Sequence, residues 1–116
     1  MTWNDIKEKM ILILQSANVR SRDLIELANQ ADELLCTENQ ITQECLEFYL
    51  YILSTPSVFE KRGVYSFIDG FRYMRAIEKL SPLQKNILVA TIEKNHHLYV
   101  EPNFRASIDT FVKDLV

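Results

Sequence analysis

Apolar residues recur every three or four positions along the first half of the chain, a spacing that predicts helices rather than strands. We expect a first helix that includes Trp3 and ends near Asn18, and a second whose N-terminus is capped by Ser21, a residue type that favours this position. Thr37 and Gln40 have the spacing of a capping box and predict the start of a third helix. The inward-facing positions of these helices are Trp3, Ile6, Met10, Ile13, Leu14 and Ala17, then Leu24, Leu27, Ala28, Ala31, Leu34 and Leu35, then Ile41, Cys45, Phe48 and Ile52.

The second half of the chain repeats this pattern between clear stop signals. The Ser-Thr-Pro at 54–56 ends the third helix, a short turn or helix follows at 58–61, and another helix is expected over residues 65–80. The sharpest boundary is at 81–84, where a serine cap, a proline at the first helical position and a glutamine at the third open a helix. A last helix follows the Glu-Pro-Asn at 101–103. The inward positions of these two helices are Leu83, Ile87, Ala90 and Ile92, then Ile108, Phe111, Val112 and Leu115.

These elements predict an all-α fold, a single-domain bundle of six to seven short helices that spans residues 1–116. The chain of 116 residues is as long as one ordinary domain and can bury about two-thirds of its unfolded surface. Only two glycines occur, and we expect the one in mid-helix, Gly70, to mark close packing between helices.

Composition and targeting signals indicate a cytoplasmic protein. The longest apolar runs, at 10–14 and 48–53, are far shorter than the roughly 20 residues needed to span a membrane. The first ten residues place two acids among their lysines and do not resemble a secretory signal. Cys36 and Cys45 are too few for a zinc site, and in a reducing compartment we expect both to be free, buried thiols.

Charge is distributed unevenly along the chain. From Asp23 to Phe59 there are seven carboxylates and no lysine, arginine or histidine, although lysine and arginine occupy 13 of the 116 positions. If the second and third helices form an antiparallel hairpin, their polar stripes join in one continuous acidic patch. These stripes are Asp23, Glu26, Gln30 and Glu33, then Gln40, Glu44, Glu47 and Tyr51.

Two other interpretations of the charge pattern remain open. The acidic stripes are also compatible with ordinary solvated helix faces, although such faces usually interleave lysine with glutamate at a spacing of four. Residues 61–94 carry seven basic and three acidic side chains, and Arg72, Arg75 and Lys79 are expected on one helical face near tyrosines. Basic residues among aromatics can bind nucleic acid, but Asp69 and Glu78 interrupt this patch and the net charge is −3.

No pattern in the chain predicts catalysis. The only histidines, His96 and His97, are adjacent, so on a helix they point about 100° apart and do not readily share one metal ion. Two glycines cannot form a glycine-rich phosphate loop, and no serine or cysteine stands in a nucleophile motif. We therefore predict a protein that is not an enzyme and has no catalytic residues, metal or cofactor.

A small, acidic, helical chain without catalytic motifs resembles the bacterial immunity proteins that inhibit nuclease toxins of the colicin and contact-dependent inhibition types. The resemblance is in overall character. The tyrosine pair that colicin DNase inhibitors carry directly before a proline is absent, because Leu50 separates Tyr49 from Tyr51 and Pro56 lies further on. The resemblance implies a protein that covers the basic substrate cleft of a toxin with carboxylates and tyrosines.

The leading hypothesis is a cytoplasmic immunity or inhibitor protein that binds a basic toxin, a nuclease, through its acidic helical surface. Glu44, Glu47 and Tyr51 form the expected centre of the binding surface, and Glu26 and Glu33 its flank. The partner is a protein, neither a membrane nor a nucleic acid. One alternative is a regulatory adaptor or phage-type inhibitor of another protein. The other is a helical domain that binds nucleic acid through Arg72, Arg75 and Lys79.

Overall fold

A computed structural model describes all 116 residues and contains seven α-helices and no strand, which confirms the all-α prediction. No helix combines the length and the apolar character needed to cross a membrane. The helices are α1 (Trp3–Gln15), α2 (Ser21–Thr37), α3 (Gln43–Ser54), α4 (Pro56–Phe59), α5 (Tyr65–Tyr73), α6 (Pro82–Asn95) and α7 (Pro102–Leu115), with short 3-10 helices at Ala76–Lys79 and His96–Leu98.

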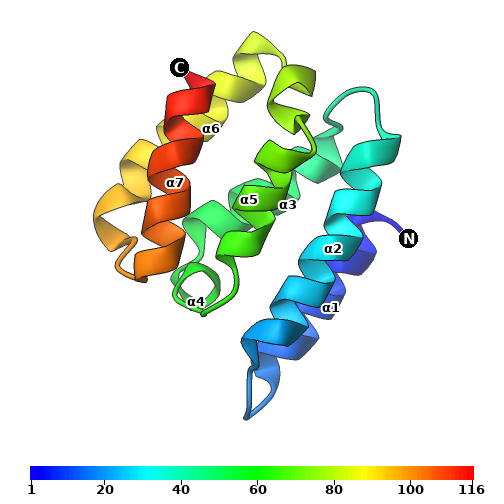
Figure 1. Cartoon of the computed structure of the whole chain (residues 1–116), viewed down its shortest axis with the longest axis vertical. Coiled ribbons are helices and arrows are strands. Elements are labelled where there is room, and N and C mark those ends of the chain that lie inside the picture. The colour runs from blue at the N-terminus through cyan, green and yellow to red at the C-terminus, as the bar shows by residue number, and fades with distance from the viewer.

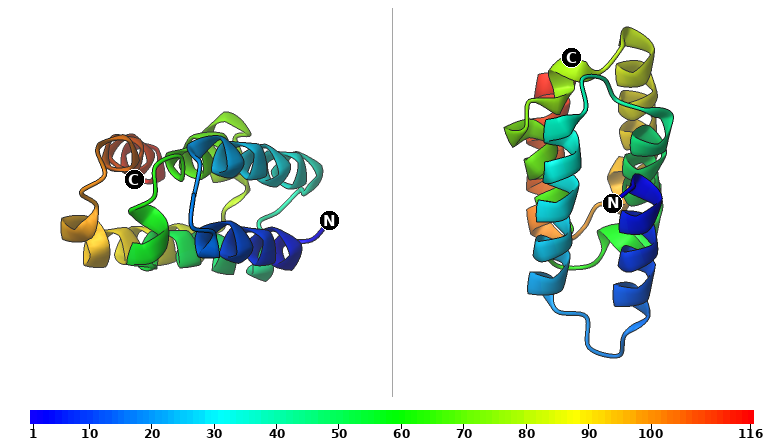
Figure 2. Two further views of the ribbon diagram at one scale, coloured as in Figure 1. Left: turned by 90° about the horizontal axis from the view of Figure 1, so that it is seen from below. Right: turned by 90° about the vertical axis from the view of Figure 1, so that its right-hand side faces the viewer.

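The long helices form two layers, and the chain alternates between them (Figure 1). Helices α2, α5 and α7 make one layer and α1, α3 and α6 the other, as the view from below shows most clearly (Figure 2, left). The molecule measures 39 × 33 × 20 Å, and its shortest dimension is that of two stacked helices, each about 10 Å in diameter. Within the layers α2 packs on α5, α5 on α7 and α3 on α6, while α1 and α2 pack on each other across them.

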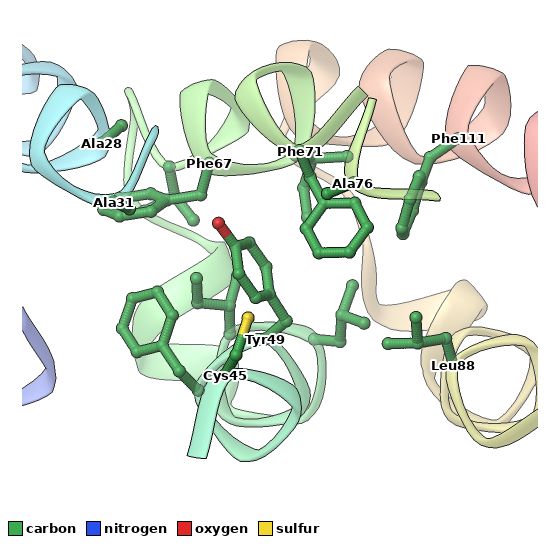
Figure 3. Close-up of a cluster of buried hydrophobic side chains, with 14 of the residues drawn as sticks. Ala28, Ala31, Cys45, Tyr49, Phe67, Phe71, Ala76, Leu88 and Phe111 are labelled. Carbon is green, nitrogen blue, oxygen red and sulfur yellow. The ribbon is translucent and has the colours of Figure 1, made fainter. Parts of the chain in front are cut away.

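One apolar core lies between the layers and is rich in aromatic rings. Tyr49 of α3 packs edge-on against Phe71 of α5 at 4.8 Å between ring centroids, and Phe71 meets Phe111 of α7 at 5.6 Å (Figure 3). Thirty buried residues form a single cluster with these rings. The centre of the core therefore joins three helices that are distant in sequence.

Of the three helix caps predicted from the sequence, one is correct and two are wrong. The capping box at Ser81 and Gln84 is present, with both reciprocal hydrogen bonds and Pro82 at the first helical position. Thr37 does not open α3, because α2 runs on through it and its hydroxyl donates to the Leu34 carbonyl. The cap of α3 is Thr42, whose hydroxyl accepts a hydrogen bond from the Cys45 amide at 3.2 Å.

The predicted cap of α2 is also wrong, and α1 is shorter than predicted. Arg20 occupies the cap position of α2 without a side-chain hydrogen bond, and Ser21 is already the first helical residue. Helix α1 ends at Gln15, so Ala17 lies outside it and is exposed. Both errors arise because several residues near 16–21 favour caps and turns, and the sequence alone does not choose among them.

The helix expected over residues 65–80 is interrupted, which corrects the prediction of one continuous element. Helix α5 ends at Tyr73, and Arg75 has a left-handed backbone conformation with φ +55°. A 3-10 helix then carries Lys79 to the end of α2, where its ammonium donates to the Leu35 carbonyl. Arg72, Arg75 and Lys79 therefore do not share one helical face.

The inward face of α6 also differs from the prediction. Leu88 and Ile92 are buried, whereas Leu83 and Ala90, predicted to face inward, are exposed. Apolar residues occur all around this helix from 87 to 92, so periodicity does not identify one face. Contacts with α3 and α7 decide which face is buried.

Candidate functional site: a furrow between helices α1 and α2

The two acidic stripes do not form one surface. Helix α2 packs on α1 and α5, and α3 packs on α1 and α6 in the other layer, so the predicted antiparallel α2–α3 hairpin is wrong. The connector at 38–42 carries the chain from one layer to the other, and its Ile41 is buried near the end of the 3-10 helix that follows α5. Helix α1 lies between the two stripes.

Helix α1 brings basic side chains to both stripes, although the acidic run itself contains none. The Lys7 ammonium lies 4.8 Å from the centroid of the Tyr51 ring, a cation–π contact. Lys9 donates to the Gln30 side chain at 3.3 Å. The missing positive charges are therefore supplied in part by a helix that precedes the acidic run, and Tyr51, an expected anchor, already has a cationic neighbour.

Helices α1 and α2 lie at one edge of the molecule, with no other helix in front of them (Figure 2, right), and a groove runs between them. Adjoining depressions follow it, from one of about 340 Å³ near Leu12 and Leu27 to one of about 520 Å³ near Met1 and Leu34. They connect through shared lining residues, Lys9 and Leu12 on one side and Gln30 on the other. At the Met1 end the hollow continues past Trp3 to the start of α3. We call this continuous hollow the furrow.

The furrow is strongly acidic. Seven carboxylates line it, and Lys9 is the only lysine or arginine among the lining residues. Met1, which carries the amino terminus, also lines it. The seven acids are Asp5, Glu8, Asp23, Glu26, Glu33, Glu38 and Glu44. Such a concentration of one sign in a hollow raises the local concentration of cationic groups.

Four of the seven carboxylates already have a partner within the chain. Asp23 pairs with Arg20, the cap residue of α2, at 3.1 Å, and Glu26 pairs with Arg22 at 3.6 Å. Asp5 accepts the Thr2 amide in the capping box of α1, and these hydrogen bonds lower its pKa. Glu38 accepts the Trp3 indole N–H at 2.7 Å. The remaining three, Glu8, Glu33 and Glu44, are exposed and have neither an ion pair nor a hydrogen bond.

Apolar side chains interrupt this acidic lining. Leu12 is 67% exposed and Met1 57% exposed, while Leu27, Leu34 and Ile13 form the less accessible floor. Leu12 belongs to the apolar run at 10–14 but lies off the inward stripe of α1. An apolar residue off the inward stripe is the sequence signal for an exposed apolar contact, whereas no such signal marks Glu8, which also lines the furrow.

The five residues predicted to bind a partner are divided by the structure. Glu26, Glu33 and Glu44 line the furrow. Glu47 lies on α3 outside it and accepts the Gln43 side-chain amide at 3.2 Å, and Tyr51 follows one turn later. The furrow thus brings together Glu26 and Glu33, the predicted flank of the binding surface, with Glu44, one of the three residues predicted for its centre.

Each of the three basic residues considered for nucleic-acid binding has a contact within the chain. Arg72 pairs with Asp114 of α7 at 2.7 Å, and Arg75 pairs with Glu78 at 2.9 Å. Lys79 donates to the Leu35 carbonyl. Because they lie on different elements and are engaged locally, they form no joint positive face.

Polar groups elsewhere in the molecule are placed apart from the furrow. His96 lies 3.1 Å from Asp109, while His97 is exposed, and no three potential metal ligands are grouped together. Cys45 is buried, as expected, and burial raises the pKa of its thiol. Cys36 is exposed, contrary to the expectation of two buried thiols, because it lies on the outer side of α2.

Asp32 is a half-buried carboxylate on the inner side of α2. A Cβ at Gly70 of α5 would lie 2.1 Å from its Oδ1, which confirms that Gly70 permits close helix packing. Oδ1 is buried without a hydrogen-bond partner, and desolvation raises the Asp32 pKa to about 6. Burial in the α2–α5 contact therefore favours the protonated, neutral form of Asp32 over its carboxylate.

We expect Asp32→Asn to stabilise the protein at pH 7 by about 1 to 2 kcal/mol, an advantage that disappears near pH 4. The folded-state pKa lies above the ordinary value, so the ionised form is penalised above about pH 6 and the penalty is lost as pH falls towards 4. Two pKa units correspond to about 3 kcal/mol, reduced here because the group is partly solvated. Urea unfolding of variant and wild type at both pH values measures the difference. The exposed Glu33→Gln serves as control, and an unchanged advantage at pH 4 would contradict the assignment.

Comparison of the chain with protein families, curated proteins and solved structures finds no match. The function of the chain is therefore inferred from the geometry and charge of the furrow.

Proposed function

We propose that this chain is an inhibitor or immunity protein that binds a basic protein in the α1–α2 furrow. The observation that carries the proposal is the charge of the furrow, where seven carboxylates and one lysine surround exposed apolar side chains. An exposed apolar patch rimmed by like charges is typical of a protein-binding surface. A cationic partner is the one that such a surface attracts.

Charge and apolar contact have different roles in this proposal. The carboxylate field speeds the encounter with a basic partner, and it acts most strongly at low salt. Apolar side chains that become desolvated on binding slow dissociation. Together they suit an inhibitor that must capture its target quickly and hold it.

A nuclease toxin is the partner class that the resemblance to immunity proteins implies. Its substrate cleft is basic because it binds a polyanion, so the surface around it is opposite in charge to the furrow. The site of action that follows is the cytoplasm, where such a toxin attacks nucleic acid. A regulatory adaptor would use the same furrow on a target that is not a nuclease, and an activity assay separates the two.

The test is capture followed by inhibition. Immobilised wild-type chain and the Glu33→Lys/Glu44→Lys variant are exposed to lysate of the source cells, and proteins retained only by the wild type are identified and purified. We expect a basic protein whose nuclease activity falls to zero at a one-to-one ratio with the wild-type chain. A captured protein that keeps its activity would refute inhibition. Retention of the chain itself on heparin would favour the nucleic-acid alternative.

A further inference from the structure

We infer that the element of the partner that enters the furrow is an amphipathic helix, with an apolar stripe flanked by lysine or arginine residues. This inference rests on the proposed function and adds the shape and the side-chain pattern of the ligand. It follows from the length of the furrow, the spacing of its apolar contacts and the position of its free carboxylates.

The furrow has the dimensions of a helix. It follows α1, whose 13 residues span about 20 Å at about 1.5 Å per residue, the length of a ligand helix of three to four turns. Two packed helices with an open groove accept a third through their side-chain ridges. An extended peptide fits less well, because an all-helical protein offers no strand edge to pair with its backbone groups.

The apolar floor has two contact points that match a helical ligand. Leu27, which is 3% exposed, lies at the base of one depression, beside the exposed Leu12 of α1, and Leu34 lies in the other, beside Met1, which precedes α1. Leu27 and Leu34 are two turns apart on α2, so they are separated by about 10 Å along the helix axis. Apolar side chains at positions i and i+7 of a ligand helix have this same separation.

The positions of the free carboxylates predict where the ligand helix carries its positively charged side chains. Glu8 lies on the α1 side of the furrow, Glu33 on the α2 side and Glu44 at the Met1 end. A helix in the furrow therefore has an acidic rim on both sides. Lysine or arginine residues that flank its apolar stripe meet that rim, whereas glutamates would be repelled.

Lys9 and Gln30 form a bridge between the two apolar contact points. Their hydrogen bond of 3.3 Å joins α1 to α2. Both residues line the depression near Leu27, and each also lines a second, adjoining depression. A ligand helix must displace this bridge or place a small side chain over it. Removing the positive charge at Lys9 should therefore favour a basic ligand.

The experiment uses synthetic peptides as probes. The first, about 14 residues long, has leucines spaced 3 and 4 apart and lysines on both flanks. The second has the same composition in scrambled order, and the third has glutamate in place of lysine. We expect the first to bind at least about tenfold more tightly than the second by calorimetry, and the third not to bind. Amide chemical-shift changes should fall on α1, α2 and the start of α3.

Matched variants locate the contact. Leu12→Ser should weaken binding of the first peptide by about tenfold, whereas Leu83→Ser on α6, a leucine of equal exposure, should not change it. Lys9→Met should tighten binding severalfold, whereas Lys7→Met, outside the furrow, should not.

Three outcomes would overturn the inference: equal binding of the scrambled peptide, shift changes centred away from α1, α2 and the start of α3, or no binding of any peptide. None of them would refute the proposed function, which fails only if the captured partner is not basic or is not inhibited. The two proposals are therefore tested separately.

Discussion

Reversing two free carboxylates of the furrow, Glu33→Lys together with Glu44→Lys, slows association with the basic partner by at least about tenfold at low salt. Both side chains are exposed and unpaired, so their replacement costs the fold little. Charges at an interface act mainly on the encounter rate, and two reversals change the local charge by four units. Stopped-flow kinetics over a series of salt concentrations measures the effect, and circular dichroism verifies folding.

A matched control separates local from overall charge. Glu47→Lys together with Glu93→Lys makes the same change in net charge at exposed positions of α3 and α6, neither of which lines the furrow. We expect this variant to slow association less than about threefold. If it slows association as much as the furrow variant, the outer surface of α3 or the net charge governs binding, and the furrow does not.

Phe71→Ala lowers the free energy of unfolding by about 3 to 5 kcal/mol. The ring is 1% exposed and packs against Tyr49 and Phe111, so its removal leaves a cavity where α3, α5 and α7 meet. A domain of ordinary stability has only about 5 to 15 kcal/mol in total, so the loss is a large share. Urea unfolding at pH 7, followed by circular dichroism, measures it.

Tyr73→Ala is the control for this core substitution. Tyr73 lies two residues further along the same helix and is 80% exposed, and we expect its loss to change stability by less than about 0.5 kcal/mol. If Phe71→Ala does not fold, Phe71→Leu should fold with a loss of about 1 to 2 kcal/mol. Equal small effects at Phe71 and Tyr73 would contradict the packing described for the core.

The sequence predicted those parts of the fold that depend on neighbours within one or two turns. The spacing of apolar residues predicted an all-helical chain and, in α2, the whole buried stripe, including Leu24 and Ala31. The capping box at Ser81 was identified because all its hydrogen bonds are local. Similar local signals gave the wrong start for α3, because Thr37 and Thr42 are both suitable caps. Ile41 is buried against a segment distant in sequence, a contact that local patterns do not predict.

The candidate site was predicted only in part. The acidic run identified Glu26, Glu33 and Glu44, which line the furrow. It could not identify Glu8 or Leu12, since both belong to a helix outside the run. Nor could it show that Lys7 contacts Tyr51, a cation–π pair formed between α1 and α3.

By itself, then, the sequence determined that the chain is helical, where several helices begin and end, and that its acids are concentrated in one segment. Periodicity and capping operate over a few residues, and those interactions can be read along the chain. The tertiary structure alone decided that α1 separates the two acidic stripes, that α5 ends early so that Lys79 reaches Leu35, and that the furrow faces outward. These features depend on which helices become neighbours, a choice made by the packing of a core whose contacts join residues distant in sequence.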